Sequence, residues 1–90
     1  MKARVLVRPR KGVLDPQGEA VRHALGTLGF EGVREVRVGK LIEIDLDESD
    51  PARAREQVAE MCEKLLANTV IEDWEVELEP EPAAAAAEGR

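Results

Sequence analysis

The sequence predicts one small α+β domain, and the evidence is two kinds of periodicity. Residues 3–8, 36–46 and 72–79 alternate apolar and polar side chains with the period of a β-strand. Between these segments lie two stretches with helical spacing, and each is preceded by an Asp-Pro pair. A chain of 90 residues has room for one core, so we expect a single sheet covered by helices.

The first strand, residues 3–8, is followed by a helix that Asp15 can cap, with Pro16 at its first position. We expect this helix to end near Leu28, because Gly29 can adopt the left-handed conformation that closes a helix. Its apolar stripe is expected to pack on the sheet. The stripe comprises Ala20, Val21, Ala24, Leu25 and Leu28.

The middle strand region keeps one phase of apolar residues from Val36 to Leu46, but Gly39 and Lys40 interrupt it. Glycine at the first central position of a two-residue loop suits a type II′ hairpin. The unbroken phase equally suits one long, bent strand with Gly39 at a bulge. The hairpin is slightly favoured.

The second helix is expected to begin at Asp50 and Pro51, and the last strand to bury alternate residues from Trp74 onward. The second helix's apolar stripe comprises Ala54, Val58, Met61, Cys62 and Leu65. The domain is expected to span residues 1–79. Residues 80–90, rich in Pro, Ala and Glu, are expected to form a disordered tail.

This element order corresponds to a ferredoxin-like β-α-β(2)-α-β sheet with two helices packed on one face. If Gly39 is a bulge and not part of a hairpin, one long bent strand replaces the middle pair of strands. Helices on one face leave the other face uncovered, and small domains often gain stability by association. We therefore expect the chain to dimerise through the sheet.

Charge and composition exclude several classes of partner. The net charge of −6 disfavours nucleic acid and anionic membrane surfaces. Basic residues dominate residues 1–40 and acidic residues dominate 41–90, which can orient subunits or can simply reflect two solvated ends. One cysteine allows no intramolecular disulfide, and no long apolar segment occurs, so a cytoplasmic protein is expected.

The side chains available for catalysis are few: one His, one Cys and no Tyr. His23 is predicted on the polar face of its helix, and Cys62 in an apolar stripe as a core thiol of raised pKa. The acidic residues 45–50 lack the pattern of a calcium loop and are interpreted as a solvated turn. We expect no catalytic residue, no cofactor and no metal site on this chain.

A basic loop, Arg8, Arg10 and Lys11 beside Gly12, could hold a phosphate or a partner's carboxylates. It lacks a glycine-rich phosphate loop, and Asp15 disfavours anions at the neighbouring helix terminus. A contact between subunits is therefore favoured over nucleotide binding. Trp74 is either an interface anchor or ordinary core.

Three segments carry a resemblance to a known family: GVLDPQG at residues 12–18, VREVRVGKLIEI at 33–44 and MCEKLLANTVIEDWEVEL at 61–78. Together they resemble the PurS family over about residues 5–78. Two positions depart from the family pattern. Thr69 stands where proline is frequent and Trp74 where tyrosine is common, which affects the stiffness of a turn and one aromatic hydroxyl contact.

The resemblance implies a non-catalytic subunit of phosphoribosylformylglycinamidine (FGAM) synthase in purine biosynthesis. Its implied partners are the synthetase subunit PurL and the glutaminase subunit PurQ, with ammonia passing between them and ATP and Mg used by the complex. A homodimer or homotetramer is expected. The expected partner-contact residues are Arg8, Arg10, Lys11, Asp15, Pro16, Gln17, Gly18, Gly39 and Lys40.

Two other functions are consistent with the residues. A ferredoxin-like regulatory module would bind a small effector between its subunits. An independent enzyme using the basic loop would show turnover by the isolated chain.

Overall fold

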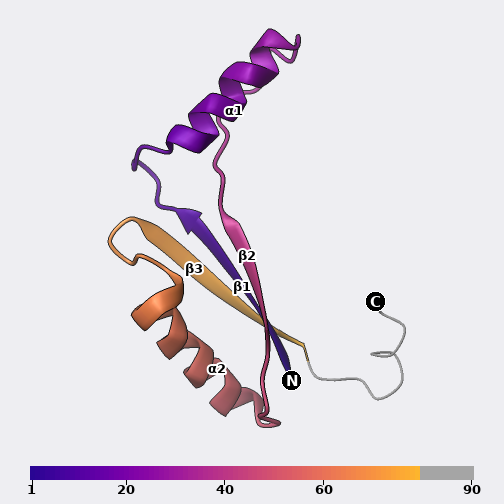
Figure 1. Ribbon diagram of the computed structural model, residues 1–90, viewed down its shortest axis with the longest axis vertical. Helices are drawn as coiled ribbons and strands as arrows, with labels where there is room; N and C mark the ends of the chain where they lie inside the picture. Colours follow the sequence, from indigo (N-terminus) through magenta and orange to yellow (C-terminus); the bar gives the residue numbers. More distant parts are fainter. Residues whose placement is uncertain (80–90) are drawn as a thin grey trace, which may run out of the picture.

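The computed structural model describes residues 1–79, in which three strands and two helices alternate along the chain (Figure 1). The strand–helix order predicted from periodicity is confirmed, and the chain is an α+β protein. The predicted tail at 80–90 lies outside the described residues. The elements are β1 (Lys2–Pro9), α1 (Pro16–Thr27), β2 (Lys40–Asp45), α2 (Pro51–Met61) with a π-helical turn (Cys62–Leu66), and β3 (Glu72–Glu79).

The three strands form one antiparallel sheet in the order β2-β1-β3. The central strand β1 pairs Val5 with Ile42 of β2 on one side and with Val76 of β3 on the other. These branched residues share one face of the sheet, because side chains alternate between faces. The register therefore places the apolar phase of all three strands on the same side.

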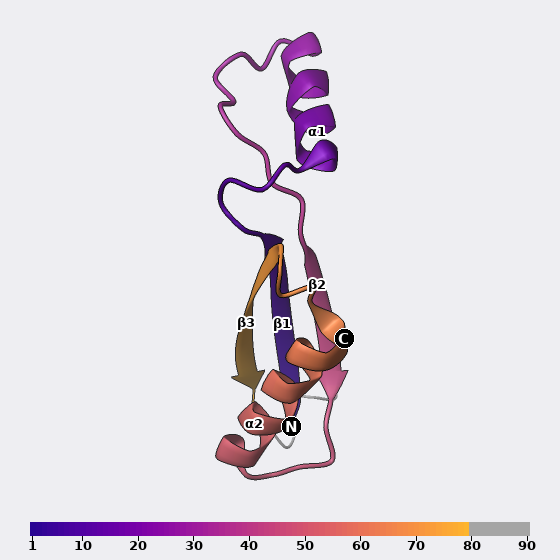
Figure 2. The same cartoon turned by 90° about the vertical axis from the view of Figure 1, so that its left-hand side faces the viewer.

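Helix α2 crosses that apolar face and supplies the other half of the core (Figure 2). Val58 and Cys62 are completely buried against Val5 and Val7. Burial raises the pKa of the Cys62 thiol, with the Glu63 carboxylate as a smaller cause, as predicted for a core cysteine.

Leu65, expected in the same stripe, is instead 81% exposed. The reason is the wider turn at the end of α2, where the amide of Ala67 bonds the carbonyl of Cys62. The extra residue in that turn shifts the helical phase, so Leu66 rather than Leu65 packs against the core.

Helix α1 stands beyond the end of the sheet (Figures 1 and 2). The prediction that both helices pack on one face is wrong for α1: Gly18 is its only buried residue, and Val21 is 41% and Leu28 73% exposed. The Cα radius of gyration, 16.8 Å, exceeds the roughly 12 Å of a compact domain this size. The start of α1 instead contacts residues 33–39, which precede β2 and which we call the extended segment.

The hairpin predicted at Gly39 and Lys40 is also wrong, and so is the alternative of a strand that starts at Val36: β2 is one short strand, Lys40–Asp45. Residues 33–39 run on in an extended conformation without pairing in the sheet, and β2 begins only at Lys40. Gly39 does not have the positive φ that a type II′ turn would need. Pairing between β1 and β2 stops at Lys40, opposite Val7, although β1 itself continues to Pro9 beside β3.

Candidate functional site

The residues predicted to contact partners come together where α1 joins the sheet, which we call the joint. Arg8 lies near the end of β1, Asp15 caps α1 and Lys40 opens β2 (Figure 1). Of the nine predicted residues only Gly18 is buried. The sequence prediction therefore selected a set of residues that is contiguous in space, and its role in partner contact stays a prediction.

Asp15 attaches α1 to the extended segment. One carboxylate oxygen accepts from the Gly18 amide at 3.1 Å and the other from the Val38 amide at 2.8 Å. These bonds, that of Val38 first, hold the pKa of Asp15 below its ordinary value of 3.8. The helix cap was predicted, but the bond to Val38, 23 residues away, had no signal in the sequence.

Two glycines allow backbones to approach closely at the joint. A Cβ on Gly18 would lie 2.1 Å from the carbonyl oxygen of Val36, and one on Gly39 would lie 2.2 Å from that of Val7. Gly18 thus lets α1 touch the extended segment, and Gly39 lets that segment pass the end of β1. Pro16 and Gln17, in the first turn of α1, are exposed.

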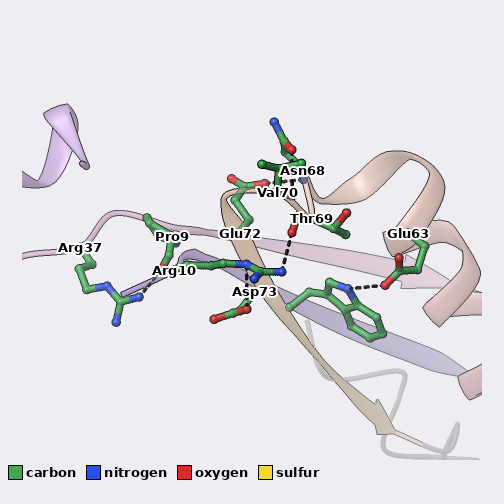
Figure 3. A network of polar contacts seen from close by, with 10 residues as sticks. Pro9, Arg10, Arg37, Glu63, Asn68, Thr69, Val70, Glu72 and Asp73 are labelled. Atoms are coloured by element: carbon green, nitrogen blue, oxygen red, sulfur yellow. Dashed lines mark hydrogen bonds and ion pairs between the residues drawn. The ribbon is translucent and has the colours of Figure 1, made fainter. Parts of the chain in front are cut away.

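The basic loop is tied to β3 by acids that the linear sequence does not place near it (Figure 3). Arg8 Nη2 lies 2.8 Å from Glu75 Oε1, and Arg10 Nε lies 3.4 Å from Asp73 Oδ1. Arg10 also donates from Nη2 to the carbonyl of Thr69 at 2.5 Å. Two of the three predicted cations therefore already have anionic neighbours.

Arg37 is a member of the joint that sequence reasoning missed. Its guanidinium donates to the carbonyl of Pro9 (Figure 3). In the sequence Arg37 stands between Val36 and Val38. This alternation weakly indicated that the Arg37 side chain lies on the side opposite to the two valines. Lys11 forms no ion pair within residues 1–79.

Trp74 is half-buried against the core, and its indole Nε1 donates to Glu63 at 3.3 Å. His23 is exposed on α1. Residues 1–79 contain no group of three or more potential metal ligands, and none of their helices has the length and hydropathy needed to cross a bilayer.

The geometry thus describes a small α+β protein with a protruding helix and a charged joint of ion pairs and backbone anchors. Comparison with known proteins identifies its family. Residues 2–80 match the family model for PurS, phosphoribosylformylglycinamidine (FGAM) synthase. The chain belongs to the PurS family, the small subunit of FGAM synthase in the purine biosynthetic pathway.

Individual relatives agree. The PurS subunit of Methanocaldococcus jannaschii is 45% identical over 78 residues, 87% of this chain and 94% of the relative. That of Bacillus subtilis is 50% identical over 78 residues, 87% and 92% of the two chains. The crystal structure of the M. jannaschii protein superposes with a TM-score of 0.81 at 44% identity, covering 90% of this chain and 98% of that one.

A chain in the structure of PurLQS from Thermotoga maritima is also similar. Its TM-score is 0.76 at 34% identity, and the match covers 84% of this chain and 93% of that chain.

Proposed function

We propose that this chain is a non-catalytic organiser that holds PurL and PurQ in one FGAM synthase complex. The likeness to a chain of the T. maritima PurLQS structure supports these partners. In this proposal ATP and Mg are used on the larger subunits, and this chain contributes geometry. Ammonia released by a glutaminase must reach the synthetase before it is protonated or lost, so holding the two sites in register raises flux.

The observation that carries the proposal is the exposure of α1. Its apolar side chains lie outside the core, and an isolated 12-residue helix is marginally stable in water. Exposed apolar surface of this kind marks protein–protein contact. The exposed apolar residues of α1 and its flanking loops are Leu14, Val21, Leu28 and Phe30.

Self-association is the second part of the proposal, as a homodimer or homotetramer. The uncovered sheet face is the predicted contact, but its side chains are largely charged and already paired: Arg4 lies 3.8 Å from Glu43 and 3.5 Å from Glu79. Burying these ion pairs would cost desolvation, whereas burying the apolar face of α1 is favourable. Contact between subunits through α1 is therefore favoured.

The test is reconstitution of glutamine-dependent amidation with purified PurL and PurQ, with and without this chain. We expect activity to require the chain and the Leu28→Glu variant to lose both self-association and complex formation. Ala52→Glu, which places the same charge on an exposed residue of α2 that is not a large apolar side chain, is the control for which assembly is retained. Full activity without the chain would refute the proposal.

A further inference from the structure

A hollow of about 290 Å³ at the joint is lined by cations from separate parts of the chain. Arg8 comes from β1, Lys11 from the following loop and Arg37 from the extended segment. The rest of its wall belongs to β3. Those residues are Asp73, Trp74 and Glu75.

The lining has an excess of positive charge in a chain whose net charge is −6. Its three cations face two carboxylates, and Asp73 is additionally shared with Arg10 at 3.4 Å. Lys11 has no ion pair within residues 1–79, so its charge is not compensated there. A hollow with surplus cations attracts an anion.

The backbone around Lys11 and the guanidinium of Arg37 are also held in place before any ligand arrives. The Val13 amide bonds the Arg10 carbonyl at 3.1 Å and Gly12 has φ +85°, which closes a tight turn around Lys11. Arg37 is fixed by the Pro9 carbonyl, one residue from the Val38 amide that Asp15 holds. A preorganised site loses less entropy when it binds.

Arg8 can be recruited at low cost. Its ion pair with Glu75 is about half exposed on both sides, and exposed pairs of this kind contribute little to stability. The guanidinium can therefore turn from Glu75 to a better anion without destabilising the sheet.

We propose that Lys11, Arg37 and Arg8 form an anion site that takes one oxyanion group, a phosphate or a carboxylate. The hollow, about 290 Å³, has room for one such group between the three cations. Guanidinium and ammonium groups bind both kinds of oxyanion through charge-assisted hydrogen bonds. The group can belong to a free phosphate compound or to a carboxylate side chain of a partner subunit.

The first arm of the test follows backbone amides and the Trp74 indole by NMR while inorganic phosphate is added at constant ionic strength. We expect saturable shifts confined to residues 8–11, 37 and 73–75. Lys11→Met should weaken phosphate binding about tenfold, because it removes one charge-assisted contact. Arg53→Met, which removes an exposed cation of α2 outside the hollow, should bind as the native chain does.

The second arm measures the affinity of the same variants for purified PurL and PurQ. A weaker affinity for Lys11→Met, with phosphate competing against assembly, assigns the anion to a partner's carboxylate. Normal assembly with impaired phosphate binding assigns it to a free phosphate compound. The site is refuted if shifts are non-saturable and Lys11→Met assembles like the native chain. The phosphate arm is independent of the proposed function, so failure of the native chain to assemble would leave it interpretable.

Discussion

The two helices of this protein begin alike and end in opposite environments. Each has an aspartate cap followed by proline, and each carries an apolar stripe. α2 buries Ala54 and Val58 on the sheet, whereas α1 buries only Gly18. An amphipathic pattern therefore shows that a helix needs a partner surface, but not whether that surface lies in the same chain.

The difference originates in what holds each helix. α2 is held along its length by side-chain packing against β1 and β3. α1 is held at its first turn by the Asp15 carboxylate and by the close approach of Gly18 to Val36. The attachment of α2 is therefore a hydrophobic core, whereas that of α1 is a few polar and backbone contacts at one end.

The largest effect is expected from Val58→Asp. Val58 is completely buried, and an unpaired charge there costs about 3–5 kcal/mol, a large share of the stability of a small domain. Val21→Asp on α1 is the matched change at a 41% exposed valine and should leave folding of the chain intact. Urea unfolding followed by circular dichroism measures both. Equal destabilisation would mean that α1 packs as α2 does.

A smaller effect, in opposite directions, is expected at two glycines of α1. Gly18→Ala places a Cβ 2.1 Å from the Val36 carbonyl oxygen and should cost about 1–3 kcal/mol, because the joint must open. Gly26→Ala meets no atom within 4 Å and should stabilise the helix by about 1 kcal/mol. Thermal unfolding of the two variants separates them. Stabilisation by Gly18→Ala would contradict the close approach.

The local features of both helices were predictable from sequence, while the long-range contacts that form the joint were not. Asp15 and Pro16 identify the start of α1, and Gly29, with φ +102°, follows its last turn as expected. The hydrogen bond from the Val38 amide to Asp15 links positions far apart in the chain, so no local sequence pattern predicts it. The placement of α1 depends on such contacts, and generic packing rules favoured the sheet instead.

The acids of β3 illustrate the same limit for the candidate site. Arg8 and Arg10 have no acid beside them in sequence, but the antiparallel register brings Glu75 and Asp73 to them. The positive charges of the basic loop could be identified from the sequence. Which acids lie beside them could not, because that depends on the order of the strands in the sheet. Lys11 and Arg37 became the informative cations only once that order was known.

A pH dependence confined to the joint is expected from Asp15. Its folded pKa is depressed, so its contribution to stability is full above the ordinary value of 3.8 and is lost as pH falls through the lower folded value. Asp15→Asn should remove this acid-sensitive part and weaken protection of the Val38 amide. Hydrogen exchange at Val38 against pH measures it. An unchanged exchange profile in the variant would show that the carboxylate does not hold α1.

The smallest effect is expected from the pair that Glu60 of α2 forms with Lys64 of the following π-helical turn. Their charged atoms lie 2.6 Å apart, and the side chains are 63% and 73% exposed, respectively. The hydrogen bond from Lys64 lowers the pKa of Glu60, and the same bond raises the pKa of Lys64. Solvent and salt screen such a pair, so Lys64→Met should leave the Tm unchanged within error while returning the pKa of Glu60 toward its ordinary 4.5 in an NMR titration. A large fall in Tm would show that this pair stabilises the helix far more than an exposed i,i+4 pair normally does.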